Sequence, residues 1–536
     1  MKKTFILSFA IFFMQGHVIA QSNTKPNILF IAVDDLKPIL GAYGNTFIKT
    51  PNIDRLSKMG TTFLSNYCQQ AVCGPTRASL LTGMRPDITK IWDLKTQLRD
   101  VSPDIVTLPQ YLITQGYSTQ GIGKVFDTRN VDENIDKVSW SVPYYKTDKK
   151  YYVPELGEPA EGRYQLKETK LQAEKIISDA LANGKTKAEA NNEATLKVRP
   201  TTECIDVPDN AYNDGANILE AKDILAQLSK KNEPFFFAVG IAKPHLPFVA
   251  PKKYWDLYKR EDIILEPFQD KIQNPIEVAY HNAGELRAYT DIPAVIASTP
   301  QKDFGLTLSV DKQKELLHGY YAAISYTDAL VGKLLNTLDS LGLTKNTIIV
   351  LWGDHGWHLG DHNLWCKHSN FEQATHSPLI ISAPGLTANK TNSFSEHVDI
   401  FPTLCDLAGI AIPSQLQGKS LKPIMKNPTA SVKEYSISQY PRSGVDEEND
   451  RLGYAPANVM GYSIRNRQYR YTIWMKNSFR TTQSFKAESV IGDELYDYDA
   501  DPLEKINVAK DKNYEATTKL LKAKMLAYFA SQVTKK

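Results

Sequence analysis

Four short apolar segments, separated by helical patterns, constrain the fold of this chain most strongly. They lie at residues 26–35, 116–124, 234–243 and 346–356, and each is bounded by Gly, Pro or Asn. The longest helical pattern, at 311–341, has apolar residues at three-to-four spacing. Alternating strands and helices predict an α/β fold with a large, mostly parallel sheet sandwiched by helices.

Charged and histidine side chains follow each apolar segment. In an open α/β sheet, ligands bind beyond the carboxyl ends of the strands, so these side chains should share one rim. Three of them are carboxylates, which repel one another unless a cation lies between them. Oxygen ligands favour calcium or magnesium, whereas a histidine among them indicates either a softer metal or a tolerated ligand in a calcium site. The residues are Asp34, Asp35, Lys124, Lys243, His245, Asp354 and His355.

A helix start at residues 71–83 adds an anion site to this rim. Cys73 stands at the start, Pro75 falls in the first turn, where its missing N–H does no harm, and Gly83 closes the apolar run. The free N–H groups of a helix N-terminus suit a tetrahedral anion such as sulfate or phosphate. Arg77, four residues after Cys73, lies on the same helix face. A plain thiolate is an odd nucleophile for a sulfate ester, so spacing alone leaves the chemistry of Cys73 open.

The pattern changes near residue 431. Short strands are expected at 435–440, within 461–475 and at 494–499, and a helix at 513–533 ends the chain. We therefore expect a catalytic domain over 21–430 and a small C-terminal α+β subdomain with an antiparallel sheet over 431–536. The segment 155–198, rich in Lys, Glu and Ala, is expected to be an exposed, partly helical insertion.

The N-terminus has the pattern of an export signal. Two lysines precede an apolar stretch at 5–14, and Val18-Ile19-Ala20 fits a cleavage site before Gln21. The stretch is too short to span a bilayer, and no later segment reaches eighteen apolar residues. Residues 1–20 are thus expected to be a signal peptide, and the mature protein to be periplasmic or secreted, without a membrane span.

Charge and cysteine usage exclude several classes of protein. The 63 basic and 60 acidic residues leave a net charge of +3, which indicates neither a nucleic-acid partner nor an anionic membrane. Five cysteines in a chain of 536 residues do not make a disulfide scaffold, and no CxxC pair indicates structural zinc. The other four cysteines are expected to be buried small residues: Cys68, Cys204, Cys366 and Cys405.

Residues 73–77, Cys-Gly-Pro-Thr-Arg, resemble the signature of the type I, formylglycine-dependent sulfatases. The resemblance covers nearly the whole mature chain and is greatest to the iduronate-2-sulfatase branch, which shares Asp354-His355 where most sulfatases have Asp-Asn. It implies an alkaline-phosphatase-like fold and an enzyme that hydrolyses sulfuric esters. The other segments that carry it are, in the family's order, 34–35, 123–124, 242–248, 353–362, 367–379, 396–410, 416–421 and 494–507.

The resemblance also implies cofactors and roles. Cys73 would be oxidised to Cα-formylglycine by a maturation enzyme, and its hydrated aldehyde would be the nucleophile. Arg77 would orient this group, and Lys124 would contact its hydroxyls and the sulfate. His245 would protonate the departing sugar oxygen, with Lys367 on the same side. One calcium ion per chain would be bound by Asp34, Asp35, Asp354, His355 and residue 73.

One position departs from the branch, which typically has histidine where this chain has Asp127. Asp127 could replace it as the base that releases sulfate, or could face away and cap the next turn. Lys243, Trp357 and His358 are candidate substrate-binding residues, although Trp357 and His358 could equally only pack in the interior.

The substrate expected from the resemblance is a sulfated oligo- or polysaccharide, either a glycosaminoglycan uronate or an algal polysaccharide such as ulvan. Two alternatives remain open. One is a phosphoester or phosphonate hydrolase of the same superfold, in which two zinc ions and a Ser or Thr nucleophile would be typical. The other is an inactive homologue that binds sulfated glycans.

Overall fold

The computed structural model describes residues 25–151, 164–293, 305–442, 458–476 and 487–533. Its centre is a sheet of seven strands: β1 (Asn27–Val33), β2 (Thr61–Tyr67), β3 (Ser118–Gly123), β5 (Phe235–Ile241), β7 (Thr347–Gly353), β10 (Leu379–Ser382) and β11 (Asn389–Glu396). Their order is β11-β2-β10-β7-β1-β5-β3. Only β10 runs antiparallel to its neighbours in this sheet, so the predicted mostly parallel sheet is confirmed.

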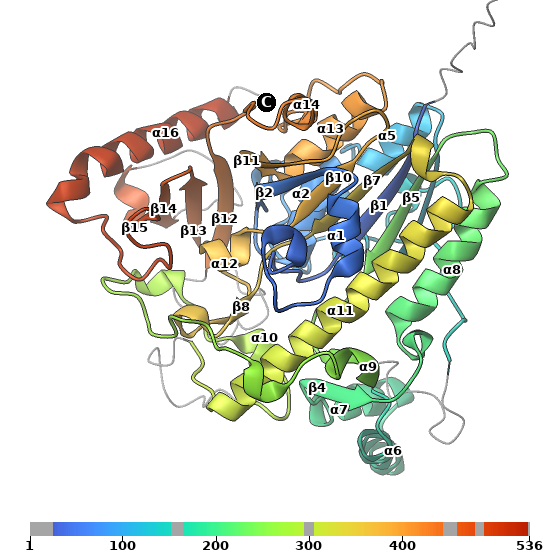
Figure 1. Ribbon diagram of the computed structural model, residues 1–536. Helices are drawn as coiled ribbons and strands as arrows, with labels where there is room; N and C mark the ends of the chain where they lie inside the picture. Colours follow the sequence, from blue (N-terminus) through green and yellow to red (C-terminus); the bar gives the residue numbers. More distant parts are fainter. Residues whose placement is uncertain (1–24, 152–163, 294–304, 443–457, 477–486, 534–536) are drawn as a thin grey trace, which may run out of the picture.

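Helices cover both faces of the sheet, as Figure 1 shows. Alternate residues of β1 face opposite ways, so Leu29 and Ile31 join one hydrophobic core, while Ile28 and Phe30 join the other. The first core is closed by α8 (Asn213–Leu228) and α11 (Val310–Ser340), and the second by α2 (Cys73–Thr82), α5 (Leu108–Thr114) and α13 (Ile400–Leu407). A strand buried on both faces explains why 28–33 is continuously apolar.

The remaining elements are short. The helices are α1 (Pro51–Ser57), α3 (Pro86–Thr89), α4 (Leu98–Val101), α9 (Lys252–Trp255), α10 (Gly284–Arg287), α12 (Glu372–Thr375) and α14 (Lys422–Lys426). Two small sheets pair β4 (Thr202–Ile205) with β6 (Phe248–Pro251), and β8 (His358–Leu359) with β9 (Trp365–Cys366).

The C-terminal region forms a second sheet, which is antiparallel as predicted. Its order is that of the sequence: β12 (Ser436–Arg442), β13 (Val459–Arg465), β14 (Tyr469–Lys476) and β15 (Val490–Asp497). The last helix, α16 (Glu515–Val533), packs Leu521 and Met525 against this sheet. In Figure 1 this unit lies beside the β11 and β2 edge of the central sheet.

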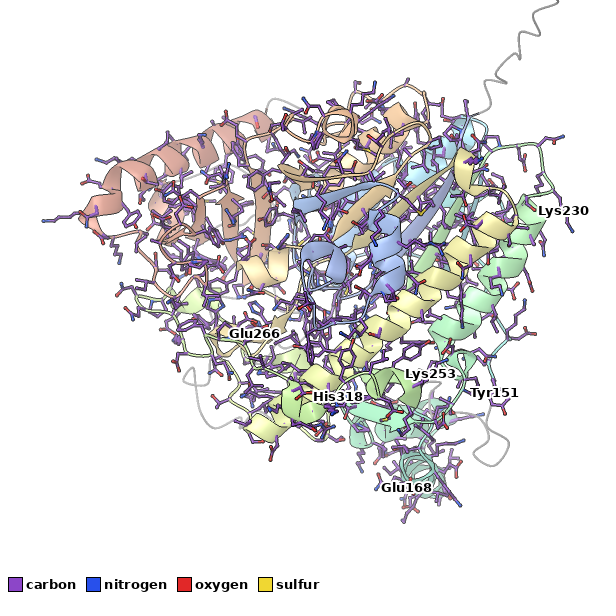
Figure 2. The ribbon with its side chains drawn as sticks, in the orientation of Figure 1. Tyr151, Glu168, Lys230, Lys253, Glu266 and His318 are labelled. Carbon is purple, nitrogen blue, oxygen red and sulfur yellow. The ribbon has the colours of Figure 1, made fainter. Side chains whose placement is uncertain are left out.

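The predicted insertion contains two helices, α6 (Lys167–Ala182) and α7 (Lys187–Lys197). They pack on each other through a small core of Ala173, Ala194 and Val198. Figure 2 shows Glu168 of α6 at the margin of the molecule, far from the central sheet. Polar residues cover most of this pair because only one narrow face of each helix is buried.

The predicted signal peptide, 1–20, lies outside the described residues. Among the residues that the structure does describe, no helix is long and apolar enough to cross a membrane. All five cysteines are free thiols, and Cys68, Cys366 and Cys405 are buried as expected. The expectation for Cys204 is wrong, because it points outward from the short edge strand β4.

A buried carboxylate, Glu396 at the end of β11, connects the central sheet to the C-terminal unit. Its oxygens accept hydrogen bonds from Arg85 at 2.7 and 2.8 Å, from Lys433 at 2.6 Å and from the Ile437 backbone N–H at 2.9 Å. Burial alone would raise the pKa of Glu396, but Arg85 and Lys433 lower it from 4.5 to about 2. A lowered pKa in the folded state means that the ionised carboxylate stabilises the fold.

We therefore expect Glu396 to make unfolding pH-dependent between about pH 5 and pH 2. Its contribution is complete above the unfolded-state pKa and is lost as the pH falls through about 2, a difference of roughly 3 kcal/mol. Denaturant unfolding across this range should show a shallower loss of stability in Glu396→Gln than in the wild type. Glu434→Gln, at a highly exposed glutamate, is the matched control. Identical pH dependence in Glu396→Gln and the wild type would contradict the assignment.

Candidate active site

Four parallel strands end at one rim and bring the predicted polar residues together. Asp34 and Asp35 follow β1, and Asp354 follows β7, its neighbour in the sheet. The Asp35 N–H donates to the Asp354 carboxylate at 2.9 Å, and the Asp354 N–H donates to the Val33 carbonyl at 3.2 Å. Lys124 and His245 come from the ends of β3 and β5 on the other side. The rim predicted from the sequence is therefore present.

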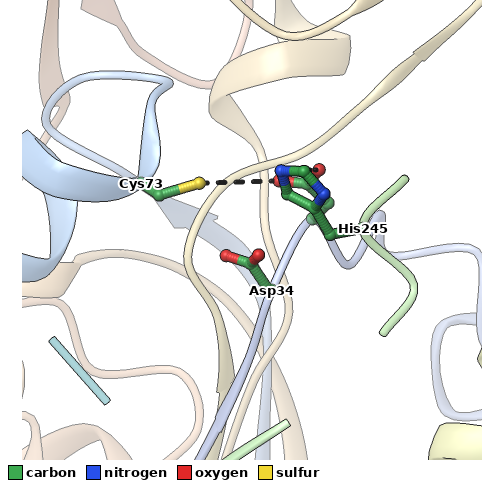
Figure 3. Close-up of side chains that lie close together, drawn as sticks. Asp34, Cys73 and His245 are labelled. Atoms are coloured by element: carbon green, nitrogen blue, oxygen red, sulfur yellow. Dashed lines mark hydrogen bonds and ion pairs between the residues drawn. The ribbon is translucent and has the colours of Figure 1, made fainter. Parts of the chain in front are cut away.

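Cys73 begins helix α2, as predicted, and lies in the middle of this rim. Val72 before it is extended, Pro75 lies in the first turn, and Gly83 ends the helix at a left-handed φ of 67°. The Cys73 Sγ lies 3.8 Å from Asp35 Oδ1 and 3.5 Å from His355 Nε2. Figure 3 shows Cys73, Asp34 and His245 pointing toward one another from three different elements.

The Cys73 thiol is poorly suited to act as a thiolate. It is completely buried, and burial together with the Asp34 carboxylate raises its pKa well above the ordinary value. Because the thiolate is the nucleophilic form of cysteine, this environment favours an inert thiol at pH 7. The site therefore has the geometry for a nucleophile at residue 73 but the wrong electrostatics for an unmodified one.

Arg77 links two of the carboxylates. Its guanidinium donates to Asp34 Oδ1 at 2.9 Å and to Asp354 Oδ2 at 3.0 Å, and it also bonds the backbone carbonyls of Lys124 and Val125. Arg77 is fully buried between these partners. It thus holds the carboxyl ends of β1 and β7 in a fixed arrangement around Cys73, and losing it would leave buried carboxylates unpaired.

Two lysines approach the same cluster from opposite sides. Lys124 Nζ lies 2.5 Å from Asp34 Oδ2, and Lys367 Nζ lies 2.9 Å from Asp35 Oδ1. Burial alone would lower the pKa of Lys367, but Asp35 raises it well above the ordinary value. Both side chains therefore remain ammonium ions, placed where they can neutralise a bound anion.

The donor set fits a divalent cation. The ligand atoms of Asp35, Cys73, Asp354 and His355 all lie within 4.8 Å of one another and are buried. His355 Nδ1 lies 2.9 Å from the Gly356 carbonyl, and its Nε2 faces the carboxylates of Asp35 and Asp354, 3.3 and 3.6 Å away. Burial raises the pKa of Asp35 to about 7. A cation between these atoms would offset the cost of burying the negative charge.

His245 and Lys367 lie together on the side away from Arg77. A glutamate that sequence analysis missed, Glu285 of α10, joins them, because its Oε1 lies 3.1 Å from His245 Nε2 and 3.0 Å from Lys367 Nζ. Glu285 follows no strand and lies in no recognised motif, so the sequence contains no signal for it. His245 Nδ1 lies 2.6 Å from the Leu246 carbonyl, which directs Nε2 into the site.

Asp127 caps the next turn, as in the second of its two expected roles, but it does not face away, because it also lines the pocket described below. Its carboxylate accepts hydrogen bonds from the Arg129 backbone N–H at 3.0 Å and from the Arg129 guanidinium at 2.8 and 2.9 Å. Burial alone would raise the pKa of Asp127, but Arg129 and Lys124 lower it well below the ordinary range. This environment makes Asp127 a weak base, although its Oδ2 lies only 3.9 Å from Lys124 Nζ.

The structure separates the three candidate substrate-binding residues, because Lys243 lines the pocket described next, whereas Trp357 and His358 do not. The Lys243 ammonium bonds the carbonyls of His245 and Pro247 and so holds its own loop. Trp357 is buried beneath Lys367, with Nζ 4.9 Å from the ring centre. His358 is buried and bonds Asp361 and Ser369. Trp357 and His358 therefore pack in the interior, which was their alternative reading, and do not line the pocket described next.

A pocket of about 500 Å³ opens beside the cluster. Asp34, Lys124 and His245 form its inner wall, and residues from the β3 and β5 loops and from the end of the α6–α7 insertion complete it. A volume of this size accommodates one or two sugar rings. The outer lining includes Asp127, Arg129, Arg199, Tyr212, Asn213, Asp214, Lys243 and Pro247.

Comparison with known proteins agrees with this geometry. Residues 26–410 match the sulfatase family. The human protein named iduronate 2-sulfatase is 33% identical, over 90% of this chain and 91% of its own length. The ulvan-active sulfatase of Formosa agariphila is 26% identical, over 94% and 80% respectively. The structure of a phosphonate monoester hydrolase from Agrobacterium radiobacter superposes with a TM-score of 0.64 at 21% identity, over 95% of this chain and 96% of that one.

Proposed function

The chain belongs to the sulfatase family and is a sulfuric ester hydrolase. From that premise we propose that it is an exported enzyme that removes sulfate from a carbohydrate through a formylglycine formed from Cys73. The observation that carries this proposal is the position of Cys73. It starts α2 among three carboxylates, between Lys124 and Lys367, in an environment that disfavours the thiolate.

The residues around Cys73 would serve a sulfate ester as follows. Lys124 and Lys367 would pair with sulfuryl oxygens, and their charge would stabilise the negative charge that develops as the ester bond breaks. His245 would give the proton at Nε2 to the departing sugar oxygen. Arg77 would keep Asp34 and Asp354 in place. When present, the hydrated aldehyde at residue 73 supplies the hydroxyl that attacks sulfur.

A metal ion belongs to the proposal as well. Asp34, Asp35, Asp354 and His355, with the side chain at 73, would hold it, and calcium is the ion that the carboxylates and the family resemblance favour. The ion would supply positive charge beside the sulfuryl oxygens. The fit rests on the buried carboxylates and on His355 Nε2, which faces two of them.

The substrate is proposed to be a sulfated glycosaminoglycan or algal polysaccharide, because the similar proteins include an iduronate 2-sulfatase and an ulvan-active sulfatase. Release of inorganic sulfate from a panel of defined sulfated oligosaccharides tests this. Release of phosphate from phosphoesters, with no sulfate released from any saccharide, would instead support the phosphatase alternative. Binding of sulfated glycans without release of either would support an inactive homologue.

Export is proposed from the N-terminal pattern. If the protein is secreted or periplasmic, its mature N-terminus should begin near Gln21. Mass spectrometry of the protein from the extracellular or periplasmic fraction measures this directly. A protein that keeps residues 1–20 in the cytoplasm would contradict the proposal.

Asp354→Asn should weaken metal binding and activity together. The substitution removes one negative charge from the cluster, along with the carboxylate oxygen that faces His355 Nε2 at 3.6 Å. Elemental analysis should find one calcium per wild-type chain and less in the variant, and added calcium should restore part of the activity. Asp256→Asn, at an exposed carboxylate paired with Lys252, is the control. Two zinc ions per wild-type chain would contradict the calcium assignment and favour the phosphatase alternative.

A further inference from the structure

An arginine on the outer wall of the pocket has no anionic partner among the described residues. Arg199 follows helix α7 of the insertion, and its guanidinium lies over the ring of Tyr289 with the central carbon 4.3 Å from the ring centre. Its Nη2 lies 3.5 Å from the Tyr289 hydroxyl. Its Nε is buried and has no hydrogen-bond partner. A buried N–H donor without an acceptor is rare in native proteins and calls for a ligand or water at that point.

Arg199 is also held in place before any ligand binds. Its backbone N–H donates to Thr290 Oγ1 at 3.3 Å, and its carbonyl accepts from the Thr290 N–H at 2.9 Å. Stacking on Tyr289 fixes the plane of the guanidinium. The Arg199 side chain would therefore lose little further conformational entropy when it binds an anion.

A second arginine lines the same pocket. Arg129 uses Nε and Nη2 to bind Asp127, whereas its Nη1 makes no hydrogen bond within the described chain. Its side chain remains 43% exposed. Asp127 cancels most of the charge of Arg129, so Arg199 supplies the uncompensated positive charge and Arg129 supplies a further N–H donor.

Resting on the function proposed above, we infer that Arg199, assisted by Arg129, forms a second anion subsite of the active-site pocket. Asp34, Lys124 and His245 on the inner wall would take the sulfate that is removed, and Arg199 would bind another anionic group of the same saccharide. The chemistry of the arginine fork fits a carboxylate or a second sulfate equally well. The substrate class is therefore a sulfated saccharide that carries an additional anion.

Matched pairs of substrates test the subsite. One pair is a glucuronate 2-sulfate disaccharide and its carboxyl-reduced derivative, and the other is glucosamine 6-sulfate with an N-sulfate or an N-acetyl group. The measured quantity is the ratio of kcat/KM between the anion-bearing and the anion-free member. The wild type should prefer the anion-bearing member in at least one pair, which identifies the anion as carboxylate or sulfate.

Arg199→Gln should lower this ratio by roughly 10- to 100-fold, the value of one charge-assisted hydrogen bond. In Arg199→Lys, which keeps the charge but loses the forked pair of N–H donors, the ratio should lie between those of the wild type and Arg199→Gln. Arg55→Gln removes a surface arginine paired with Asp339 and should leave the ratio unchanged. Thermal unfolding of each variant shows whether the fold persists. If Arg199→Gln is unstable, the ratio measured for Arg199→Lys still tests the subsite.

Two results would overturn the subsite: a wild-type ratio near one in both pairs, or the same ratio in Arg199→Gln as in the wild type. If no compound releases sulfate, the proposed function fails by itself. Titration calorimetry with the same compounds still decides the subsite in that case. Tighter binding of the anion-bearing member, lost in Arg199→Gln, would support it, and equal or undetectable binding of both members would refute it.

Discussion

Cys73→Ala is expected to abolish sulfate release from every substrate, by at least roughly 10⁴-fold in turnover number. The substitution removes the only atom at the start of α2 that can become a nucleophile, whereas the carboxylates, Arg77 and both lysines remain. The cost should appear in kcat rather than in KM, because the charged groups that bind sulfate are unchanged. Steady-state kinetics of purified protein at matched metal content measure the effect.

The fold should survive this change. The Cys73 Sγ makes only long contacts, at 3.5 and 3.8 Å, and the bounds of the helix are set by Val72 and Pro75 at its start and by the left-handed Gly83 at its end. Cys405→Ala, a buried cysteine in α13 outside the site, is the matched control and should remain active. A Cys73→Ala protein with near-normal turnover would show that residue 73 is not the nucleophile.

Expression without a maturation enzyme separates the thiol from the aldehyde. Such protein should fold, bind metal and release no sulfate. In active protein the peptide that contains residue 73 should be lighter than the thiol form, because the conversion removes two hydrogens and one sulfur and adds one oxygen. An active enzyme whose Cys73 peptide has the unmodified thiol mass would refute the formylglycine proposal and leave the sulfatase assignment standing. The two hypotheses can thus fail independently.

The sequence predicts the inner wall of the site well because strand ends are fixed by local pattern. A continuous apolar run such as 28–33 is typical of a strand buried on both faces, so the residue type that follows it falls at a known rim. Asp34, Lys124, His245 and Asp354 all obey this rule. Four such ends, and one helix start, define the site without any knowledge of long-range packing.

Arg199 of the outer wall and Glu285 beside His245 could not be predicted, because they reach the site through tertiary packing. Glu285 lies in a four-residue helix, and Arg199 follows an insertion whose position depends on contacts with Thr290 and Tyr289. Neither has a periodic or motif signal. Trp357 follows the Asp354-His355 motif closely, yet β7 is followed by a turn that buries it beneath Lys367. Proximity in sequence to a motif does not place a side chain in the pocket.

His245→Ala is expected to reduce turnover of a sugar sulfate by about 10²–10⁴-fold, the usual span of general acid catalysis, and turnover of an aryl sulfate much less. A sugar alkoxide is a poor leaving group that needs a proton, whereas a nitrophenolate leaves without one. The geometry distinguishes the two candidates for the acid. Lys367 is bound by Asp35 and Glu285, which hold it as an ammonium ion, while burial and Lys367 lower the pKa of His245. The imidazolium form of His245, whose Nε2 faces Glu285 Oε1 at 3.1 Å, is therefore the stronger acid of the two.

Only the comparison between the two substrates tests whether His245 is the general acid, because the loss of a contact and the loss of a proton donor both lower activity. If His245 only shaped the pocket, both substrates would lose the same factor in kcat. If it is the acid, the loss grows with the pKa of the leaving group. His318→Ala, at a half-buried histidine whose Nε2 contacts the Trp255 carbonyl and which does not line the pocket, should leave both rates unchanged. Equal losses on both substrates would transfer the role of acid away from His245, and Glu285→Gln would then test whether Lys367 can release a proton once one of its two carboxylate partners is neutral.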